Sequence, residues 1–158
     1  MTAAEALVPR DFAIPQPPAT DRYRLEPLGP QHNESDHAAW TASIEHIRAT
    51  PGFEGSSWPP VDGMTLQANL ADLRRHADDF ERRVGFTYTV RSVPGGDVIG
   101  CVYIYGSRTE PAPGEPRAVD VRSWVRADRA DLDADLYRVV RDWLAAAWPF
   151  PRLAYAPR

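Results

Sequence analysis

The stretch that decides the fold is Phe86–Tyr105, which reads FTYTVRSVPGGDVIGCVYIY. Its first residues alternate bulky apolar side chains with threonines, and a period of two is typical of a strand with one buried face. Pro94–Asp97 supplies turn residues, and the apolar run Val98–Tyr105 follows directly. The stretch therefore predicts two antiparallel strands joined by a short turn.

Patterns on either side of this hairpin complete one domain. Short alternating stretches predict further strands, and apolar residues spaced three and four apart predict helices. The predicted elements are, in chain order, a strand at 23–27, helices over 35–49 and 65–80, the hairpin, a strand at 118–125, a helix over 129–147 and a strand at 153–155. The order β-α-α-β-β-β-α-β indicates an α/β (α+β) fold, and we expect a single domain over residues 21–158.

Polar residues ahead of the predicted helices are candidates for their N-caps. Asn33 or Ser35 is placed to cap the first helix, Thr65 the second and Asp128 the third. Four prolines lie among the first 20 residues, so we expect a Pro-rich arm over residues 1–20 ahead of the domain.

Composition excludes several classes of function. The net charge of −4 gives no support for nucleic-acid binding, which needs a basic face. All 18 basic residues are arginine, so Schiff-base catalysis by a lysine is excluded, and Cys101 is the single cysteine. We find no metal-ligand cluster, no secretory signal and no apolar run of the ~20 residues that would span a membrane. We therefore expect a cytoplasmic protein without a metal.

Three stretches resemble the GNAT N-acetyltransferases, which transfer an acetyl group from acetyl-CoA to an amine. Asp97–Tyr103 (DVIGCVY) is similar to the family's third strand, and Ser123–Arg126 (SWVR) followed by Asp128–Arg129 is similar to the end of its fourth. Leu132–Leu144 matches the next helix in length and pattern. The resemblance covers residues 21–158 and implies a mixed, mostly antiparallel central sheet flanked by helices.

The resemblance also implies where acetyl-CoA would bind. In the family, the pantetheine arm contacts the backbone at the end of the fourth strand, in an opening beside the fifth. The pyrophosphate lies on free amides at the start of the next helix, where the helix dipole favours an anion. Carried over to this sequence, the cofactor-binding residues are Trp124, Val125, Arg126, Arg129, Leu132, Asp133 and Ala134.

The predicted cofactor loop departs from the family's pattern. That loop usually reads Gln or Arg, two residues, Gly, one residue, then Gly or Ala, and the matching positions here are Arg129, Leu132 and Ala134. A leucine in place of the central glycine does not favour positive φ or a close approach to phosphate. Aspartates at positions 128, 131, 133 and 135 crowd the same turn, although they would also complement the helix dipole without any ligand.

A second departure concerns the end of the sequence. The family normally continues after its fifth strand with a further helix and a hairpin that wall the cofactor, whereas this sequence ends at Arg158. Either a second copy completes the site, as in a homodimer, or the site is incomplete.

The chemistry that the resemblance implies needs a base for an ammonium substrate and an acid for the leaving thiolate. Asp120 is the candidate base, although an ion pair with Arg122 on the same strand face is the more ordinary role for such a carboxylate. Tyr155 is the candidate acid, with Tyr103 and Tyr105 of the hairpin as alternatives, and the more ordinary role of each is that of a packed aromatic residue.

The acceptor site of the family commonly borders the end of the first helix and the loop that follows. Glu45, His46 and Trp58 are therefore the candidate substrate residues, and the loop around Trp58 could equally plug the core. One function that the sequence supports is an acetyl-CoA-dependent N-acetyltransferase acting on a small-molecule amine or a protein amino group. The alternative is a catalytically inactive GNAT-fold binding protein that has lost acetyl-CoA binding, which Leu132 and the acidic turn favour.

Overall fold

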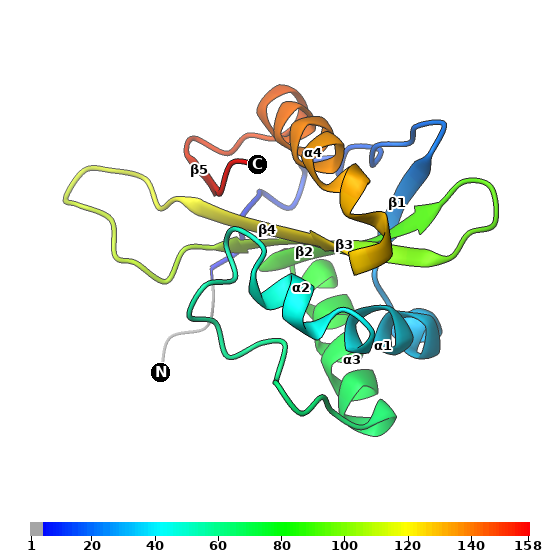
Figure 1. Ribbon diagram of the computed structural model, residues 1–158. Coiled ribbons are helices and arrows are strands. Elements are labelled where there is room, and N and C mark those ends of the chain that lie inside the picture. Colours follow the sequence, from blue (N-terminus) through cyan, green and yellow to red (C-terminus); the bar gives the residue numbers. More distant parts are fainter. Residues whose placement is uncertain (1–4) are drawn as a thin grey trace.

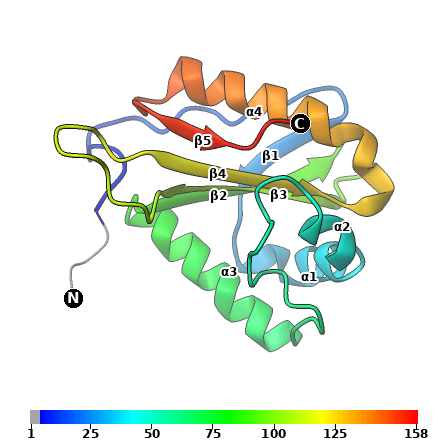
Figure 2. The ribbon, with the colours of Figure 1, turned by 60° about the vertical axis from the view of Figure 1, so that its left-hand side comes forward.

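The chain folds around one five-stranded sheet with helices on both faces (Figures 1 and 2). The structure is a computed structural model that describes residues 5–158. The strands are β1 (Tyr23–Pro27), β2 (Gly85–Ser92), β3 (Val98–Gly106), β4 (Val119–Val125) and β5 (Leu153–Tyr155). The helices are α1 (Asn33–Thr41), α2 (Ile44–Arg48), α3 (Leu66–Glu81) and α4 (Asp133–Ala147), with 3-10 turns η1 (Pro30–His32) and η2 (Ala127–Leu132).

The strands lie in the order β1-β2-β3-β4-β5, and only β5 runs parallel to its neighbour. The predicted hairpin is confirmed as β2 and β3, in which Thr87 lies opposite Tyr103. The mixed, mostly antiparallel sheet that the sequence predicted is therefore present, with the predicted order of elements.

Each face of the sheet carries its own hydrophobic core, because alternate residues of the strands point to opposite sides. Helix α4 covers one face, and α1, α2 and α3 cover the other (Figure 2). The α4 side buries Leu136, Val140 and Leu144 against residues such as Phe86 of β2. The opposite side buries Trp40 and Trp124, both fully inaccessible to solvent.

The N-terminal residues pack on the α4 side of the sheet. Val8 is only 3% exposed, and the ring of Phe12 lies 5.8 Å from that of Trp148. Arg83 donates hydrogen bonds to the carbonyl oxygens of Pro9 and Phe12, at 2.7 Å each. Residues 1–4 of the predicted arm lie outside the described residues, and its separation from the domain as a unit stays a prediction.

The first predicted helix is interrupted. Helix α1 ends at Thr41 and α2 begins at Ile44, because Ser43 leaves the helical conformation with φ of −133°. Its hydroxyl oxygen instead accepts a hydrogen bond from the Ala127 amide at 2.9 Å. A tertiary contact 84 residues away along the chain thus overrides the local helical pattern.

One of the predicted N-caps is present in the structure. The Thr65 hydroxyl accepts a hydrogen bond from the Ala68 amide at 3.0 Å and caps α3. Neither Asn33 nor Ser35 caps α1, which follows η1 directly, and Asp128 does not cap α4. The η2 turn comes first, so α4 begins at Asp133. Residues 5–158 contain no helix with the length and hydrophobicity needed to cross a membrane.

Candidate functional site

The candidate site is the place where β4 and β5 separate. The two strands pair over Val119–Val121 and Leu153–Tyr155, after which β4 continues to Val125 while β5 ends at Tyr155. We call the region between Ser123 of β4 and the start of α4 the β4–β5 opening. The resemblance places the pantetheine arm of acetyl-CoA there.

The side chain of Arg158 fills this opening. Its Nη2 donates to the Ser123 carbonyl oxygen at 2.7 Å, its Nη1 to that of Ala156 at 2.7 Å, and its Nε to Asp133 Oδ2 at 2.6 Å. Only 4% of the Arg158 side chain is exposed to solvent. The β4 carbonyl that faces the opening is therefore already bonded to the chain itself.

Tyr155 lines the same opening. Its hydroxyl lies 2.5 Å from Ser123 Oγ, and its ring packs edge-on against Tyr137 of α4 with the ring centroids 4.7 Å apart. Burial raises the pKa of Tyr155 to about 12, although the Ser123 hydrogen bond opposes this rise. The phenol is therefore protonated at neutral pH, as the acid role that the sequence assigns to it requires.

The turn after β4 holds most of the predicted cofactor residues. Arg126 pairs with Asp128, with Nη2 and Oδ2 2.6 Å apart, and the Ala127 amide donates to Ser43. The Arg129 amide donates to the Arg126 carbonyl oxygen at 2.9 Å. The 3-10 hydrogen bonds of η2 use amides that a phosphate would need.

Leu132, which stands where the family's loop has its central glycine, is accommodated without strain. Its φ of −91° is ordinary for any residue, and its side chain is 1% exposed within the core beneath α4. Ala134 is exposed on the first turn of α4. The leucine therefore anchors the turn to the core, in a conformation unlike a glycine-lined phosphate loop.

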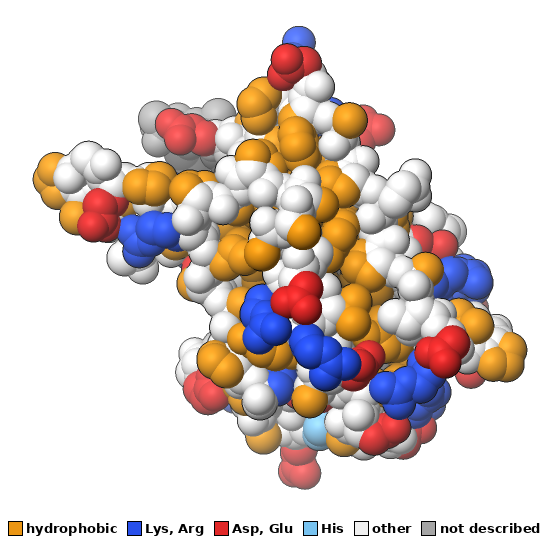
Figure 3. Space-filling view, turned by 90° about the horizontal axis from the view of Figure 1, so that it is seen from above, with side chains coloured by type: hydrophobic (Ala, Val, Ile, Leu, Met, Phe, Trp, Pro, Cys, Tyr) orange, Lys and Arg blue, Asp and Glu red, His pale blue; other side chains and the backbone are white. Residues whose placement is uncertain are grey.

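The charges around the start of α4 do not form a free basic patch. Figure 3 looks onto the α4 side, where acidic and basic side chains lie next to one another below the centre of the view. Arg22 and Arg138 both contact Asp135, and Arg158 contacts Asp133. These three cations are paired with carboxylates, which weakens their attraction for a pyrophosphate, whereas the Arg129 side chain makes no ion pair among residues 5–158. The cofactor role of the residues in this turn stays a prediction.

Asp120 lies on the opposite face of the sheet from Tyr155. It stands opposite Tyr105 of β3, and among residues 5–158 its carboxylate makes no ion pair or hydrogen bond. The ion pair with Arg122 is absent. The Arg122 guanidinium lies over the Phe53 ring at 5.3 Å. The structure therefore does not bring the candidate base and the candidate acid together.

Trp58 and Trp124 do meet, on the face covered by α1 to α3. Their ring centroids are 6.3 Å apart, and Trp58 also packs against Trp40 at 5.5 Å and Tyr103 at 5.8 Å. The Trp124 indole N–H donates to the Tyr103 hydroxyl at 3.0 Å. Val125, the next predicted cofactor residue, is 1% exposed in the core on the other face. The Trp58 loop thus packs over the core as a plug.

The remaining predicted substrate residues lie apart from this aromatic cluster. Glu45 is exposed on α2. His46 is half-buried, and its Nε2 has no hydrogen-bond partner among the described residues. Neither side chain makes a hydrogen bond or ion pair with another described residue, and the substrate roles of Glu45 and His46 stay predictions.

Sequence reasoning missed two polar networks on the α1–α3 face. In the first, the Asn69 amide donates to Asp36 Oδ2 at 3.1 Å and accepts from the Trp40 indole at 3.0 Å. Burial raises the pKa of Asp36 to about 6, with the Asn69 hydrogen bond opposing the rise. Nothing in the local sequence around Asp36 signals this burial, because Asn69 comes from a different helix.

In the second network, His76 Nδ1 lies 2.9 Å from both the Tyr105 hydroxyl and Thr87 Oγ1, and Tyr105 donates to Asp79 at 2.8 Å. Burial lowers the pKa of His76 to about 4. His76 is therefore neutral at physiological pH.

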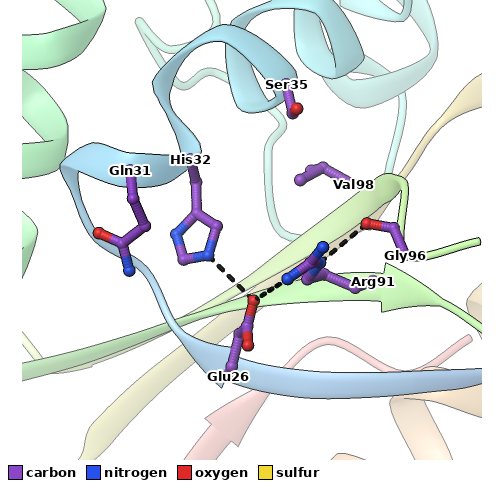
Figure 4. Close-up of a pocket in the computed structure, with 7 residues that line it drawn as sticks. All are labelled: Glu26, Gln31, His32, Ser35, Arg91, Gly96 and Val98. Carbon is purple, nitrogen blue, oxygen red and sulfur yellow. Dashed lines mark hydrogen bonds and ion pairs between the residues drawn. The ribbon is translucent and has the colours of Figure 1, made fainter.

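A polar pocket of about 300 Å³ lies away from the opening, between β1, η1 and the β2–β3 turn (Figure 4). Glu26 Oε1 accepts from Arg91 at 2.8 Å and from His32 Nε2 at 3.0 Å. Burial would raise the pKa of Glu26, but these hydrogen bonds outweigh it and hold that pKa below its usual value. The charged groups of the pocket are satisfied by one another, and no predicted site residue lies there.

Comparisons with known proteins identify the fold. No family model and no curated protein sequence matches the chain. Among solved structures, the ribosomal-protein-S5-alanine acetyltransferase of Vibrio fischeri matches with a TM-score of 0.64 at 13% identity, over 88% of this chain and 72% of that one. An acetyltransferase of Salmonella typhimurium that modifies the N-terminal serine of ribosomal protein L7/L12 matches with a TM-score of 0.62 at 10% identity, over 87% and 72%.

A third match is RimL, the ribosomal L7/L12 α-N-protein acetyltransferase, in complex with coenzyme A. Its TM-score is 0.64 at 11% identity, over 87% of this chain and 72% of that one. These likenesses concern the arrangement of helices and strands described above. The chain therefore has the fold of the GNAT acetyltransferases.

Proposed function

We propose that this chain is a GNAT-fold binding protein that does not use acetyl-CoA at the β4–β5 opening. The observation that carries the proposal is the Arg158 guanidinium, which is bonded to the Ser123 carbonyl of β4 and to Asp133 at the start of α4. Those are the backbone edge and the helix start that the family uses for pantetheine and pyrophosphate. A GNAT fold alone does not establish activity, because function depends on the site.

Acetyl-CoA would have to displace Arg158 from the opening, and this displacement would weaken its binding. A hydrogen bond to a charged group contributes about 1.5–3 kcal/mol, and Arg158 donates one to the Asp133 carboxylate. Once Arg158 leaves, the Asp133 carboxylate would face a pyrophosphate of the same sign. Both effects oppose acetyl-CoA binding.

The test is thermal unfolding of the purified protein with and without millimolar acetyl-CoA. A ligand at 100 times its Kd stabilises the folded state by about 2.7 kcal/mol, which is a readily measured rise in Tm. We expect no rise beyond that given by ADP, the matched nucleotide control. A saturable rise specific to acetyl-CoA would overturn the proposal.

The second candidate function is an acetyl-CoA-dependent N-acetyltransferase for a small-molecule amine or a protein amino group. It is favoured by the separation of β4 from β5 after Val121, the feature through which the family admits the cofactor. Asp120 would be its base and Tyr155 its acid, with the acceptor beside Trp58. This candidate requires that the wild-type protein bind acetyl-CoA measurably and that Asp120→Asn remove activity without reducing that binding.

A further inference from the structure

The groups around the Arg158 guanidinium form a complete recognition site for that chemical group. All three of its nitrogen atoms donate hydrogen bonds, to the carbonyl oxygens of Ser123 and Ala156 and to the carboxylate of Asp133. The partners come from β4, the segment after β5 and the start of α4. A planar fork of donors matches such a set of acceptors in a way that a single ammonium does not.

Two aromatic rings also line the site around the guanidinium. The Arg158 guanidinium carbon lies 5.9 Å from the ring centres of both Tyr137 and Tyr155. Rings at this distance attract a cation through their quadrupole, and guanidinium groups stack on them more readily than ammonium groups do. The Ser123 hydroxyl fixes the Tyr155 ring through its 2.5 Å contact with the Tyr155 hydroxyl.

The polar atoms that face the guanidinium are acceptors. Asp133 Oδ2 binds Nε, whereas Asp133 Oδ1 is buried and has no hydrogen-bond partner among residues 5–158. A buried carboxylate without a cation would be strongly unfavourable, so the site needs a positive occupant. The same acceptors would repel a phosphate or a carboxylate.

We infer that the β4–β5 opening is a guanidinium-binding site, occupied within the chain by Arg158 and open to a free alkylguanidinium when that side chain is removed. The class of ligand follows from the acceptor set, the carboxylate and the two rings. The inference does not depend on whether acetyl-CoA binds, and its test therefore uses no coenzyme.

The test replaces the missing part of the side chain with a small molecule. Arg158→Ala removes a fragment that ethylguanidinium reproduces, and ethylammonium is the matched cation without the fork. We expect ethylguanidinium to raise the Tm of Arg158→Ala saturably, by roughly 3–6 °C at ten times its Kd. Ethylammonium should give no comparable rise, and neither cation should stabilise the wild-type protein, whose site is filled.

Two further measurements keep the inference falsifiable. Adding Asp133→Asn to Arg158→Ala should abolish the rise given by ethylguanidinium, because the carboxylate is the site's charged partner. Equal rises for both cations, or a rise that survives Asp133→Asn, would overturn the inference. If Arg158→Ala does not fold, NMR of the wild-type Arg158 Nε–H decides. We expect slow solvent exchange there, and exchange as fast as that of the exposed Arg152 would refute the site.

Discussion

Each face of the sheet holds a carboxylate that is largely shielded from solvent, and the two carboxylates have different hydrogen-bonding partners. On the α4 side, Asp133 is held by the Arg158 guanidinium at 2.6 Å. On the opposite side, Asp36 is 4% exposed and receives a hydrogen bond from the neutral Asn69 amide. Burial raises the pKa of Asp36 to about 6. The neutral amide does not offset the loss of solvation at Asp36, whereas the less buried Asp133 is paired with a full cation.

The largest expected effect comes from breaking the charged pair. Arg158→Ala leaves Asp133 without its cation, and we expect the free energy of unfolding to fall by about 2–4 kcal/mol. Urea denaturation at pH 7 measures the loss. The matched control is Arg152→Ala, because Arg152 pairs with Glu115 at 2.9 Å but its side chain is 51% exposed. Similar losses for the two variants would mean that burial does not strengthen the Arg158 pair.

At neutral pH, we expect Asp36→Asn to raise the free energy of unfolding, whereas Arg158→Ala lowers it. Since the folded-state pKa of Asp36 is raised to about 6 from its usual value of 3.8, protonation favours the folded state. The protonated Asp36 side chain stabilises the folded state fully below pH 4, and this stabilisation is lost as the pH rises to about 6.

The difference between Asp36→Asn and wild type should therefore grow from pH 4 to pH 6 and then stay level. At pH 7.5 we expect the variant to be more stable by at most about 3 kcal/mol. Urea denaturation across this range measures it, with Asp72→Asn as the control on a more exposed helical carboxylate. A difference that does not change with pH would show that Asp36 is not a strained buried acid.

A smaller effect is expected from Tyr155→Phe, which leaves the Arg158 pair intact. The variant loses one hydrogen bond to Ser123 Oγ but keeps the ring against Tyr137. We expect a loss of about 1 kcal/mol in the free energy of unfolding, measured by urea denaturation. A loss as large as that of Arg158→Ala would mean that the hydroxyl contact, and not the ion pair, holds the opening together.

The smallest effect is expected at an exposed pair on the same helix. Arg138 contacts Asp135, and the Arg138 side chain is 59% exposed. We expect Arg138→Ala to change the free energy of unfolding by no more than about 0.5 kcal/mol, because solvent screens such pairs. Thermal unfolding at low and high salt measures the difference, which should shrink further with salt. A loss above about 1 kcal/mol would contradict the contrast between buried and exposed pairs.

The fold was predictable because its decisive patterns are local. The alternation around Tyr88 and the turn at Pro94–Asp97 specify β2 and β3 without help from distant residues. The break at Ser43 was not predictable, since its cause is the amide of Ala127. The η2 turn was not predicted either. Aspartates are compatible with a 3-10 turn as well as with the start of an α-helix, so they did not distinguish the two.

The candidate site was less predictable than the fold. Trp124 was predicted to bind the cofactor and Trp58 the substrate; the structure packs the two rings together, and both roles stay predictions. Arg158 lies in no motif, and its role depends on Asp133, 25 residues earlier in the chain. The spacing of residues along the sequence does not predict such a long-range ion pair. The roles of Asp120, Glu45 and His46 stay predictions.

The hydrogen bond between the Ala127 amide and Ser43 joins two layers that the sheet otherwise keeps apart. Ser43 belongs to the helical layer on one face, and Ala127 begins the η2 turn that leads into α4 on the other. Any ligand that shifts the η2 turn to enter the opening must therefore stretch this bond or pull on the junction of α1 and α2. A displacement of the η2 turn would therefore act first on Ser43, at the junction of α1 and α2.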